Sequence, residues 1–253
     1  ELSVEFIRVS HSIPDSCAIA VKSPVGTILF TGDFKMDFTP IDGDPTDIQR
    51  IAELGKKGLL ALYCDSTNVE RPGYSISEKE VGDTFIKIFG QVSGRIVVAT
   101  FASNLHRVQQ IIFAAERYNK KVALSGRSMI NNVKIASELG YLKVKNNTII
   151  DMKNVKSYAD DEIVVLSTGT QGEPLSALTR MANRDHKQIH LNETDTVILS
   201  SSAIPGNEIA INNVINKLTE IGVNIIYSSL ERVHASGHAC QEEIKLMYQL
   251  ATP

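Results

Sequence analysis

The sequence predicts an α/β protein whose core is a mostly parallel β-sheet covered by helices. Short apolar runs rich in Val, Ile and Leu alternate with longer segments of helical pattern, as they do in βαβ units. Most of these apolar runs end in small polar residues, which is typical of strand ends in open α/β sheets. The length of 253 residues, with 43% hydrophobic and 22% charged residues, suits one large or two small globular domains.

The first part of the chain is rich in strands. Three short strands joined by turns are expected at 4–9, 18–23 and 27–32. A short helix at 47–55 follows, and the run 59–65 has the pattern of a buried strand that ends in polar residues.

From residue 77 onward, helices and strands alternate regularly. Strands are predicted at 95–101, 121–126, 163–169, 196–202 and 224–229. Helices are predicted at 77–91, 104–119, 128–139, 207–221 and 241–251, together with one that begins at Pro174, because proline suits the first helical position. This order favours consecutive βαβ units.

Composition excludes several protein classes. No apolar run reaches the roughly 18–20 residues of a membrane span, and the N-terminus has no signal-peptide pattern. The three cysteines, Cys17, Cys64 and Cys240, are too scattered for a disulfide framework, which indicates a reducing, cytoplasmic setting. Because the chain lacks an initiating Met and stops just after a helical pattern, we expect a fragment of a longer protein.

Charge is distributed unevenly along the chain. Residues 71–156 contain 14 Lys and Arg against 6 Asp and Glu, although the whole chain has a net charge of −3. Such a basic block is a candidate surface for a phosphate backbone. It is equally typical of Lys and Arg side chains dispersed on solvated helix faces, and charge alone leaves both interpretations open.

Several predicted strands share a polar ending. Small, hydroxyl-bearing or glycine residues follow six apolar runs, at STN, ASNLHR, GRSM, TQGE, AIPGNE and the segment up to HASGHA. Single serines and asparagines there are usually helix caps. Six such loops in a row favour a surface that binds phosphates through backbone N–H groups. No GxGxxG or GxxxxGK[ST] pattern occurs, so neither a dinucleotide site nor a P-loop is supported.

Three segments carry sharper chemistry. His11 lies in VSHSIPDS (9–16), where a lone loop histidine is more often structural than a ligand. Asp33 ends a strand in FTGDFK (30–35), where it can cap a turn or bridge two metal ions. His234 and His238 flank Ser236-Gly237 in VHASGHA (233–239), a pattern typical of a loop that wraps an anion rather than of a zinc helix.

Taken together, these motifs resemble a known family. HSIPDS, GDFK, CDSTN (64–68) and HASGH, in this order, look like the β-CASP group of metallo-β-lactamase-fold nucleases, and most closely like its ribonuclease J members. TFASNLHRVQQI, SGRSM and STGTQGEP resemble the same group, so that the resemblance covers nearly the whole chain. It implies part of a metallo-β-lactamase αββα sandwich at 1–75, an inserted β-CASP parallel α/β domain at 76–228, and a return into the first domain at 229–253.

The resemblance also implies a catalytic pair. Asp65 matches the acidic residue of motif A and His238 matches the histidine of motif B. In relatives this carboxylate hydrogen-bonds the imidazole, so His238 would donate a proton to the leaving 3′ oxygen of RNA. The implied substrate-binding loop is His234, Ala235, Ser236, Gly237 and His238, which would hold a phosphate.

Metal ligands are implied at two positions. His11 matches a zinc-ligand histidine and Asp33 matches the bridging aspartate, and the complete site would hold two Zn²⁺, with Mn²⁺ as an alternative. Zinc lowers the pKa of water from 15.7 towards about 7 and so supplies an attacking hydroxide. The family's HxHxDH motif is absent, and a catalytic zinc needs at least three protein ligands, so we expect this fragment alone to be inactive.

The predicted function is that of a ribonuclease J-like, metal-dependent ribonuclease. It would cleave single-stranded RNA as an endonuclease, a 5′–3′ exonuclease or both, in rRNA processing and RNA decay, from a homo-oligomeric parent without membrane attachment. A metal-free RNA-binding or scaffold module is the alternative. A small-molecule hydrolase of the metallo-β-lactamase fold is disfavoured, because a small substrate needs no basic clamp.

Overall fold

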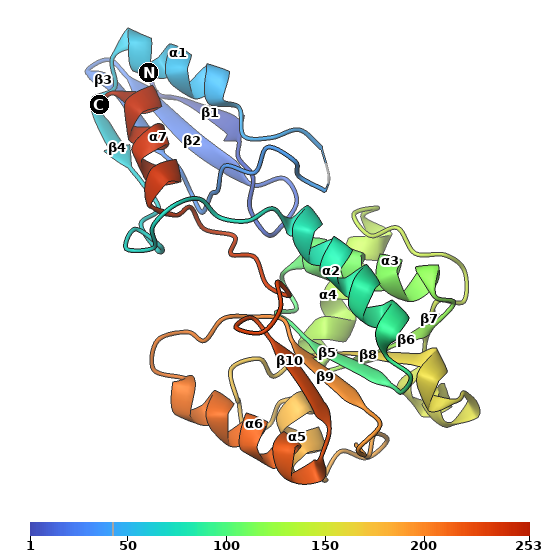
Figure 1. Cartoon of the computed structure of the whole chain (residues 1–253). Helices are drawn as coiled ribbons and strands as arrows, with labels where there is room; N and C mark the ends of the chain where they lie inside the picture. Colours follow the sequence, from blue (N-terminus) through green and yellow to red (C-terminus); the bar gives the residue numbers. More distant parts are fainter. Residues whose placement is uncertain (42) are drawn as a thin grey trace. The chain divides into compact units, whose positions relative to one another are not determined.

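The computed structural model describes residues 1–41 and 43–253 and divides into two compact units (Figure 1). The first unit consists of Glu1–Lys79 together with Ala235–Pro253. The second unit is Glu80–His234. The first unit is therefore built from two segments that are distant in sequence.

A four-stranded sheet forms the first unit. Its strands are β1 (Ser3–Arg8), β2 (Cys17–Ser23), β3 (Gly26–Phe30) and β4 (Ala61–Tyr63), in the order β1-β2-β3-β4. The pairs β1–β2 and β2–β3 are antiparallel, whereas β3 and β4 are parallel. The sheet thus contains the three short strands joined by turns and the later strand that the first part of the sequence predicts.

Two helices pack on one face of this sheet, α1 (Ile48–Lys57) and α7 (Gln241–Ala251). Leu29 of the sheet is fully buried in one core with Ile51 of α1 and Met247 of α7. The helices approach closely at Gly55, where an added Cβ would lie 2.1 Å from the carbonyl oxygen of Leu250. Glycine is needed there because any side chain would push the two helices apart.

The other face of the first sheet is apolar and uncovered within the described residues. One row across it joins Phe6, Ile19, Phe30 and Tyr63 through the strand register. Phe6 is 69% exposed and Tyr63 is 60% exposed, and the rings of Phe30 and Tyr63 stack with centroids 4.7 Å apart. A contiguous exposed apolar row of this kind marks a packing or interaction surface.

The second unit is a six-stranded sheet flanked by helices. All its strand pairs are parallel, and the order is β10-β9-β5-β8-β6-β7. The strands are β5 (Ile96–Ala99), β6 (Lys121–Ser125), β7 (Ile149–Ile150), β8 (Ile163–Ser167), β9 (Thr196–Leu199) and β10 (Asn224–Tyr227). The helices are α2 (Glu78–Gln91), α3 (Leu105–Arg117), α4 (Arg127–Glu138), α5 (Ala177–Ala182) and α6 (Glu208–Ile221), with 3₁₀ turns at Met152–Ser157 and Asp160–Glu162.

Both faces of this second sheet are buried. Val97, Val165 and Val197 share one core cluster with residues of α5 and α6. Val98 and Leu166, which point to the other face, are also fully buried, and α2, α3 and α4 lie on that side of the sheet (Figure 1). Strands buried on both faces explain the continuous apolar runs in the sequence.

The α/β class and the parallel sheet predicted from the sequence are confirmed. The helix predicted to begin at Pro174 instead begins at Ala177, because the Ser176 side chain caps it by accepting a hydrogen bond from the backbone N–H of Thr179. The two-residue strand β7 was not predicted, since two residues carry no period. Among the described residues, no helix is long and apolar enough to cross a bilayer.

Candidate active site

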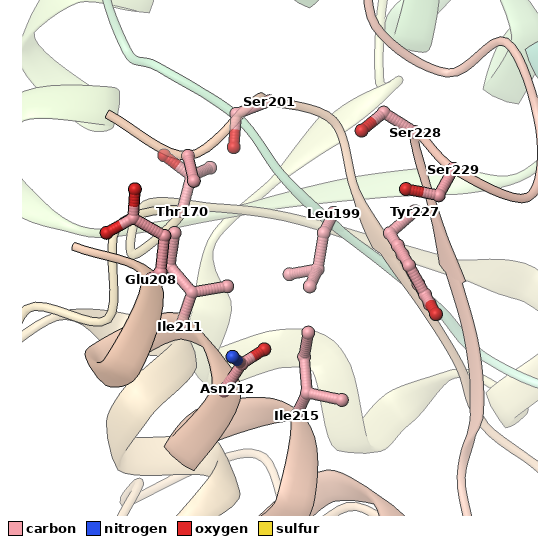
Figure 2. A pocket seen from close by; sticks show the side chains of 11 residues that line it. Thr170, Leu199, Ser201, Glu208, Ile211, Asn212, Ile215, Tyr227, Ser228 and Ser229 are labelled. Atoms are coloured by element: carbon pink, nitrogen blue, oxygen red, sulfur yellow. The ribbon is translucent and has the colours of Figure 1, made fainter. Parts of the chain in front are cut away.

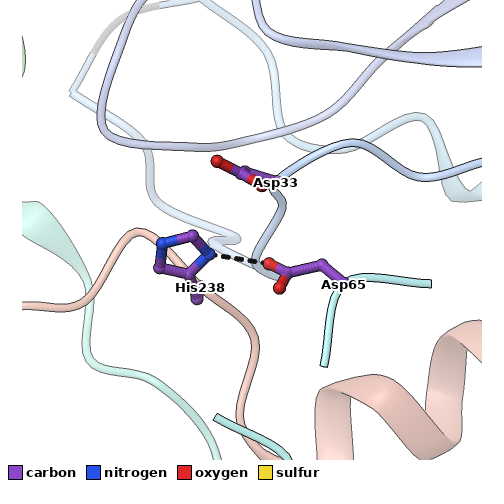
Figure 3. A group of neighbouring side chains, drawn as sticks. All are labelled: Asp33, Asp65 and His238. Atoms are coloured by element: carbon purple, nitrogen blue, oxygen red, sulfur yellow. Dashed lines mark hydrogen bonds and ion pairs between the residues drawn. The ribbon is translucent and has the colours of Figure 1, made fainter. Parts of the chain in front are cut away.

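Four side chains converge in the first unit, each from a loop at the end of a strand or helix. His11 follows β1, Asp33 follows β3, Asp65 follows β4 and His238 precedes α7. Because β3 and β4 run parallel with Phe30 opposite Tyr63, the two aspartates leave the sheet at the same edge. Figure 3 shows Asp33 above the pair formed by Asp65 and His238.

The carboxylate of Asp65 holds the ring of His238. Nδ1 of His238 lies 2.8 Å from Oδ2 of Asp65, and the Asp65 side chain is only 5% exposed. Burial of this carboxyl group opposes its ionisation, but hydrogen bonds from Thr67 and His238 outweigh burial and lower the pKa of Asp65. The charged carboxylate accepts a hydrogen bond from the Nδ1–H group of His238, which leaves Nε2 available for chemistry.

The orientation of His11 is fixed by a backbone carbonyl. Its Nδ1 lies 2.7 Å from the carbonyl oxygen of Gly237 and must donate, because a carbonyl only accepts. Nε2 therefore carries the lone pair, and it lies 3.8 Å from Oδ2 of Asp33. Burial, the largest cause, lowers the pKa of His11 and favours the neutral ring. Gly237 allows this contact, since an added Cβ would lie 2.7 Å from the His11 ring.

The cluster fits a divalent cation. Asp33, Asp65 and His238 each offer a ligand atom within 4.8 Å of the others. His11 adds an imidazole nitrogen beside Asp33. Nitrogen and carboxylate oxygen ligands suit zinc and manganese, and the Nδ1 hydrogen bond of His11 is the kind of outer contact that orients metal-binding histidines.

The loop before α7 presents a hydroxyl donor. Oγ of Ser236 accepts hydrogen bonds from Nδ2 of Asn68 at 2.8 Å and from the backbone N–H of His238 at 3.1 Å. With both lone pairs engaged, the Ser236 hydroxyl is left to donate its own proton. Ala235 of the same loop is buried, and its carbon side chain offers no polar group.

His234, the first residue of the predicted substrate loop, belongs to the second unit. Its Nδ1 lies 3.5 Å from a guanidinium nitrogen of Arg107, a fully buried residue of α3. The same nitrogen donates to the carbonyl oxygens of Ser200 and Val233. Arg107 therefore anchors the chain just before the loop, a role that the sequence motif TFASNLHR did not reveal.

Sequence reasoning also missed Glu243. This carboxylate is fully buried and accepts hydrogen bonds from the backbone N–H groups of Met36, Ser75 and Cys240 at 2.7–2.8 Å. It connects the loop after Asp33 with the start of α7. Its only sequence signal is an acidic residue in the first turn of a helix, which is ordinarily a dipole or capping feature.

The family profile and the curated proteins that match this chain carry the same description, ribonuclease J. The sequence profile described as "Ribonuclease J, beta-CASP domain" matches residues 93–218. The chain is 48% identical over 251 residues to "Ribonuclease J" of Thermus thermophilus and covers 44% of that protein. It is 46% identical over 250 residues to "Ribonuclease J" of Synechocystis, covering 39%, and 46% identical over 252 residues to "Ribonuclease J 1" of Streptococcus pyogenes, covering 45%.

These matches include 99% to 100% of the present chain, which therefore spans less than half the length of the curated relatives it matches. A crystal structure of a protein of unknown function from Enterococcus faecalis superposes with a TM-score of 0.69 at 14% identity. It covers 100% of this chain and 57% of the other chain. At this level of identity, the likeness shows the fold alone.

Proposed function

Because the chain belongs to the ribonuclease J family, we propose that it is part of a metal-dependent ribonuclease that hydrolyses phosphodiester bonds in single-stranded RNA. The observation that carries the proposal is the 2.8 Å contact between Asp65 and His238, beside His11 and Asp33. A carboxylate-held imidazole next to a metal-binding pair is the combination that phosphodiester hydrolysis needs.

In this proposal each side chain has one task. His238 in its doubly protonated form donates a proton from Nε2 to the leaving 3′ oxygen, while Asp65 holds the Nδ1 proton and so fixes the ring. Ser236 donates its hydroxyl proton to a phosphate oxygen of the substrate, with His234, Ala235 and Gly237 completing the loop. The hydrogen bonds of the site and the family resemblance support these roles.

His11 and Asp33 are the residues that would hold the metal, because Asp65 and His238, which also offer ligand atoms to the cluster, are engaged with each other. When bound, zinc or manganese acts as a Lewis acid that lowers the pKa of water towards neutrality. A catalytic zinc ordinarily takes three protein ligands, so two are too few, and we propose that the chain alone has little activity. The parent protein, acting in the cytoplasm as an oligomer, would cleave internally, from the 5′ end, or both, in rRNA processing and decay.

A metal-free RNA-binding module is the second candidate. It is favoured by the basic block at 71–156, with 14 basic against 6 acidic residues. RNA binding through such a block weakens as salt rises, because counterions are released from the phosphates. A metal chelator distinguishes the two candidates in the parent protein. A metal-dependent ribonuclease cleaves RNA and loses this activity when the chelator is added, whereas a metal-free RNA-binding module does not cleave RNA with or without the chelator.

The decisive experiment is His238→Ala in the parent protein. We expect RNA cleavage to fall by about 10²–10⁴-fold, the range that a general acid contributes, while bound metal stays near the wild-type content. Cleavage is measured on a labelled RNA and metal by elemental analysis. His190→Ala, at an exposed position of the second unit, is the matched control and should cleave normally. Undiminished cleavage by His238→Ala removes this residue from the acid role.

Asp65→Asn tests the partner carboxylate. An amide cannot supply the negative charge that holds the Nδ1 proton of His238, so we expect slower cleavage and an altered pH–rate profile. The profile is measured from pH 5 to 9 at saturating RNA. An activity loss whose pH profile matches the wild type would assign Asp65 a purely structural role.

A further inference from the structure

A pocket lies in the second unit, and none of the described residues that line it belongs to the candidate active site. It has a volume of about 260 Å³ and sits where β9 and β10 end, against the first turns of α6 (Figure 2). Its walls come from Leu199 and Ser201 at the end of β9, Tyr227 at the end of β10, and Ile211 of α6. The carboxyl edge of a parallel sheet is where such folds bind ligands.

The pocket is held open by the turn 169–172 and the loop before α6. The amide of Gln171 donates to the carbonyl oxygen of Ser202 and accepts from the backbone N–H of Ile204, which fixes that loop. Gly172 packs against the helix so closely that an added Cβ would lie 2.5 Å from the backbone carbonyl carbon of Ala210. These contacts make the pocket a preformed feature rather than a gap between loose segments.

Polar side chains around the pocket have unused hydrogen-bonding capacity. Thr170 and Ser201 are 4% and 8% exposed, yet within the described part of the chain neither hydroxyl has a hydrogen-bond partner. The same holds for the side chains of Asn212 and Ser228. Figure 2 shows the Ser201 hydroxyl directed into the cavity, with Asn212 below it and Ser228 across from it. Asn212 and Ser228 are exposed, and the hydroxyls of Thr170 and Ser201 are not among the fully buried atoms without a partner, so water reaches these groups and a ligand can replace it.

The remaining walls are apolar. Leu199, Ile211 and Ile215 line the space between the polar groups, and Tyr227 forms one side (Figure 2). The pocket is just below the roughly 300 Å³ at which typical small-molecule sites begin, so it suits a small, compact group. A flat ring with apolar faces and a polar edge matches walls of both kinds.

The charge of the residues that line the pocket restricts the chemical class of its ligand further. Glu208 is the only charged residue among the described residues that line the pocket. Its Oε2 accepts a hydrogen bond from the backbone N–H of Gly206 at 2.8 Å, which leaves Oε1 for a ligand donor. A phosphate or carboxylate would be repelled here, since no basic side chain lines the pocket to compensate for Glu208. A neutral ring that carries N–H groups is favoured.

We propose that this pocket takes one unpaired nucleobase of the RNA, an inference that rests on the proposed ribonuclease function. The base inserts between Ile211 and Tyr227, its edge donates an N–H to Glu208, and hydroxyls of Thr170 and Ser201 bond its remaining polar atoms. Its sugar and phosphates stay outside. The site binds RNA by its bases, in contrast to the phosphate contacts proposed for the Ser236 loop.

The test is a titration of this chain, labelled at isoleucine methyl groups, with guanosine, uridine, ribose and inorganic phosphate as separate probes. We expect guanosine and uridine to shift the Ile211 and Ile215 methyl resonances in a saturable way, with ribose and phosphate silent. Shifts caused by phosphate or ribose, with both nucleosides silent, would overturn the proposal in favour of an anion or sugar site.

Two matched variants sharpen the result. Ile211→Trp fills the pocket and should weaken nucleoside binding at least tenfold, as followed at the Ile215 methyl group. Ile209→Trp makes the same change at a position of α6 that is 77% exposed and should bind as the wild type does. Unchanged binding by Ile211→Trp contradicts the proposal. If nucleosides bind but the parent protein does not cleave RNA, the ribonuclease function is wrong and the pocket proposal stands. If the parent cleaves RNA but nucleosides do not bind, only the pocket proposal is wrong.

Discussion

The sheet of the first unit is covered on one face, whereas the sheet of the second unit is buried on both. Every residue of β5, β8 and β9 is buried, but β1 contains only one buried residue, Ile7. The uncovered row contains Phe6, Ile19, Phe30 and Tyr63, side chains that soluble proteins ordinarily bury. The second unit thus supplies its own core, and the first unit has a surface that calls for another layer.

This difference bears on the candidate site. His11, Asp33, Asp65 and His238 all lie in loops of the first unit, the one whose sheet is half covered. An αββα sandwich, expected from the family resemblance, would cover the exposed row with a second sheet. A second sheet is also a source for metal ligands beyond His11 and Asp33. The same second sheet would then complete both the hydrophobic core of the first unit and its metal site.

The largest expected effect compares the same substitution in the two sheets. Val165→Asp places a charge at a fully buried position of β8 and should cost more than about 4 kcal/mol of unfolding free energy. Val21→Asp, in the middle of β2 on the uncovered face, should cost about 1 kcal/mol in this chain. Urea denaturation followed by circular dichroism measures both.

Repeating this pair in the parent protein sharpens the comparison. If another layer covers the first sheet, Val21→Asp becomes a buried charge there, and its cost should approach that of Val165→Asp. Equal and small costs of Val21→Asp in the chain and in the parent would show that the face stays exposed.

A second prediction concerns the hydrogen bonds that support the site. Glu243→Ala leaves the buried N–H groups of Met36, Ser75 and Cys240 without an acceptor, so we expect a loss of about 3 kcal/mol. The neighbouring Glu242→Ala is the control. It removes only an exposed ion pair with Lys245 and should cost less than about 0.5 kcal/mol.

Metal affinity of the parent is a second measurement on Glu243→Ala. Since Glu243 fixes the loop that follows Asp33, we expect weaker metal binding in addition to lower stability. A variant as stable as Glu242→Ala would mean that water replaces the carboxylate.

The sequence predicted the second sheet well because its central strands lie in continuous apolar runs, and most of its helices have a clear apolar period. The predicted 241–251 and the observed α7, Gln241–Ala251, agree fully. The short β7 and the start of α5 escaped prediction, because a two-residue pairing and a Ser cap depend on neighbours rather than on local pattern.

Convergence of the four site residues could be anticipated only through the family resemblance. His11 and His238 are 227 residues apart, and no spacing rule joins them; their rings nevertheless lie 5.2 Å apart. The supporting residues Asn68 and Glu243 could not be identified, because a hydrogen bond between distant loops leaves no periodic signal. The domain boundaries and the roles of the site residues stay predictions.

The smallest effect expected is a pH dependence in the second unit. Nδ1 of His186 accepts a hydrogen bond from the backbone N–H of Ile189 at 3.1 Å, so the ring proton is on Nε2. Nε2 lies beside Oγ of Ser125. Burial, helped by the positive charges of Arg180 and His190, lowers the pKa of His186. Below pH 6.5, His186 is protonated in the unfolded state but stays neutral in the folded state. The free energy of unfolding therefore decreases as pH falls below 6.5, by at most about 1.4 kcal/mol per pH unit.

We expect the stability of His186→Gln to change less between pH 7.5 and 5.5 than that of the wild type, as measured by urea midpoints. Glu5→Gln in the first unit provides the contrast. Hydrogen bonds from Arg50 and Lys22 lower the pKa of Glu5 to about 2, so its contribution is complete above pH 4.5 and declines only as pH falls from there. An identical pH slope for His186→Gln and the wild type would show that the ring takes up its proton without cost, and the two units would then respond to acid alike in this range.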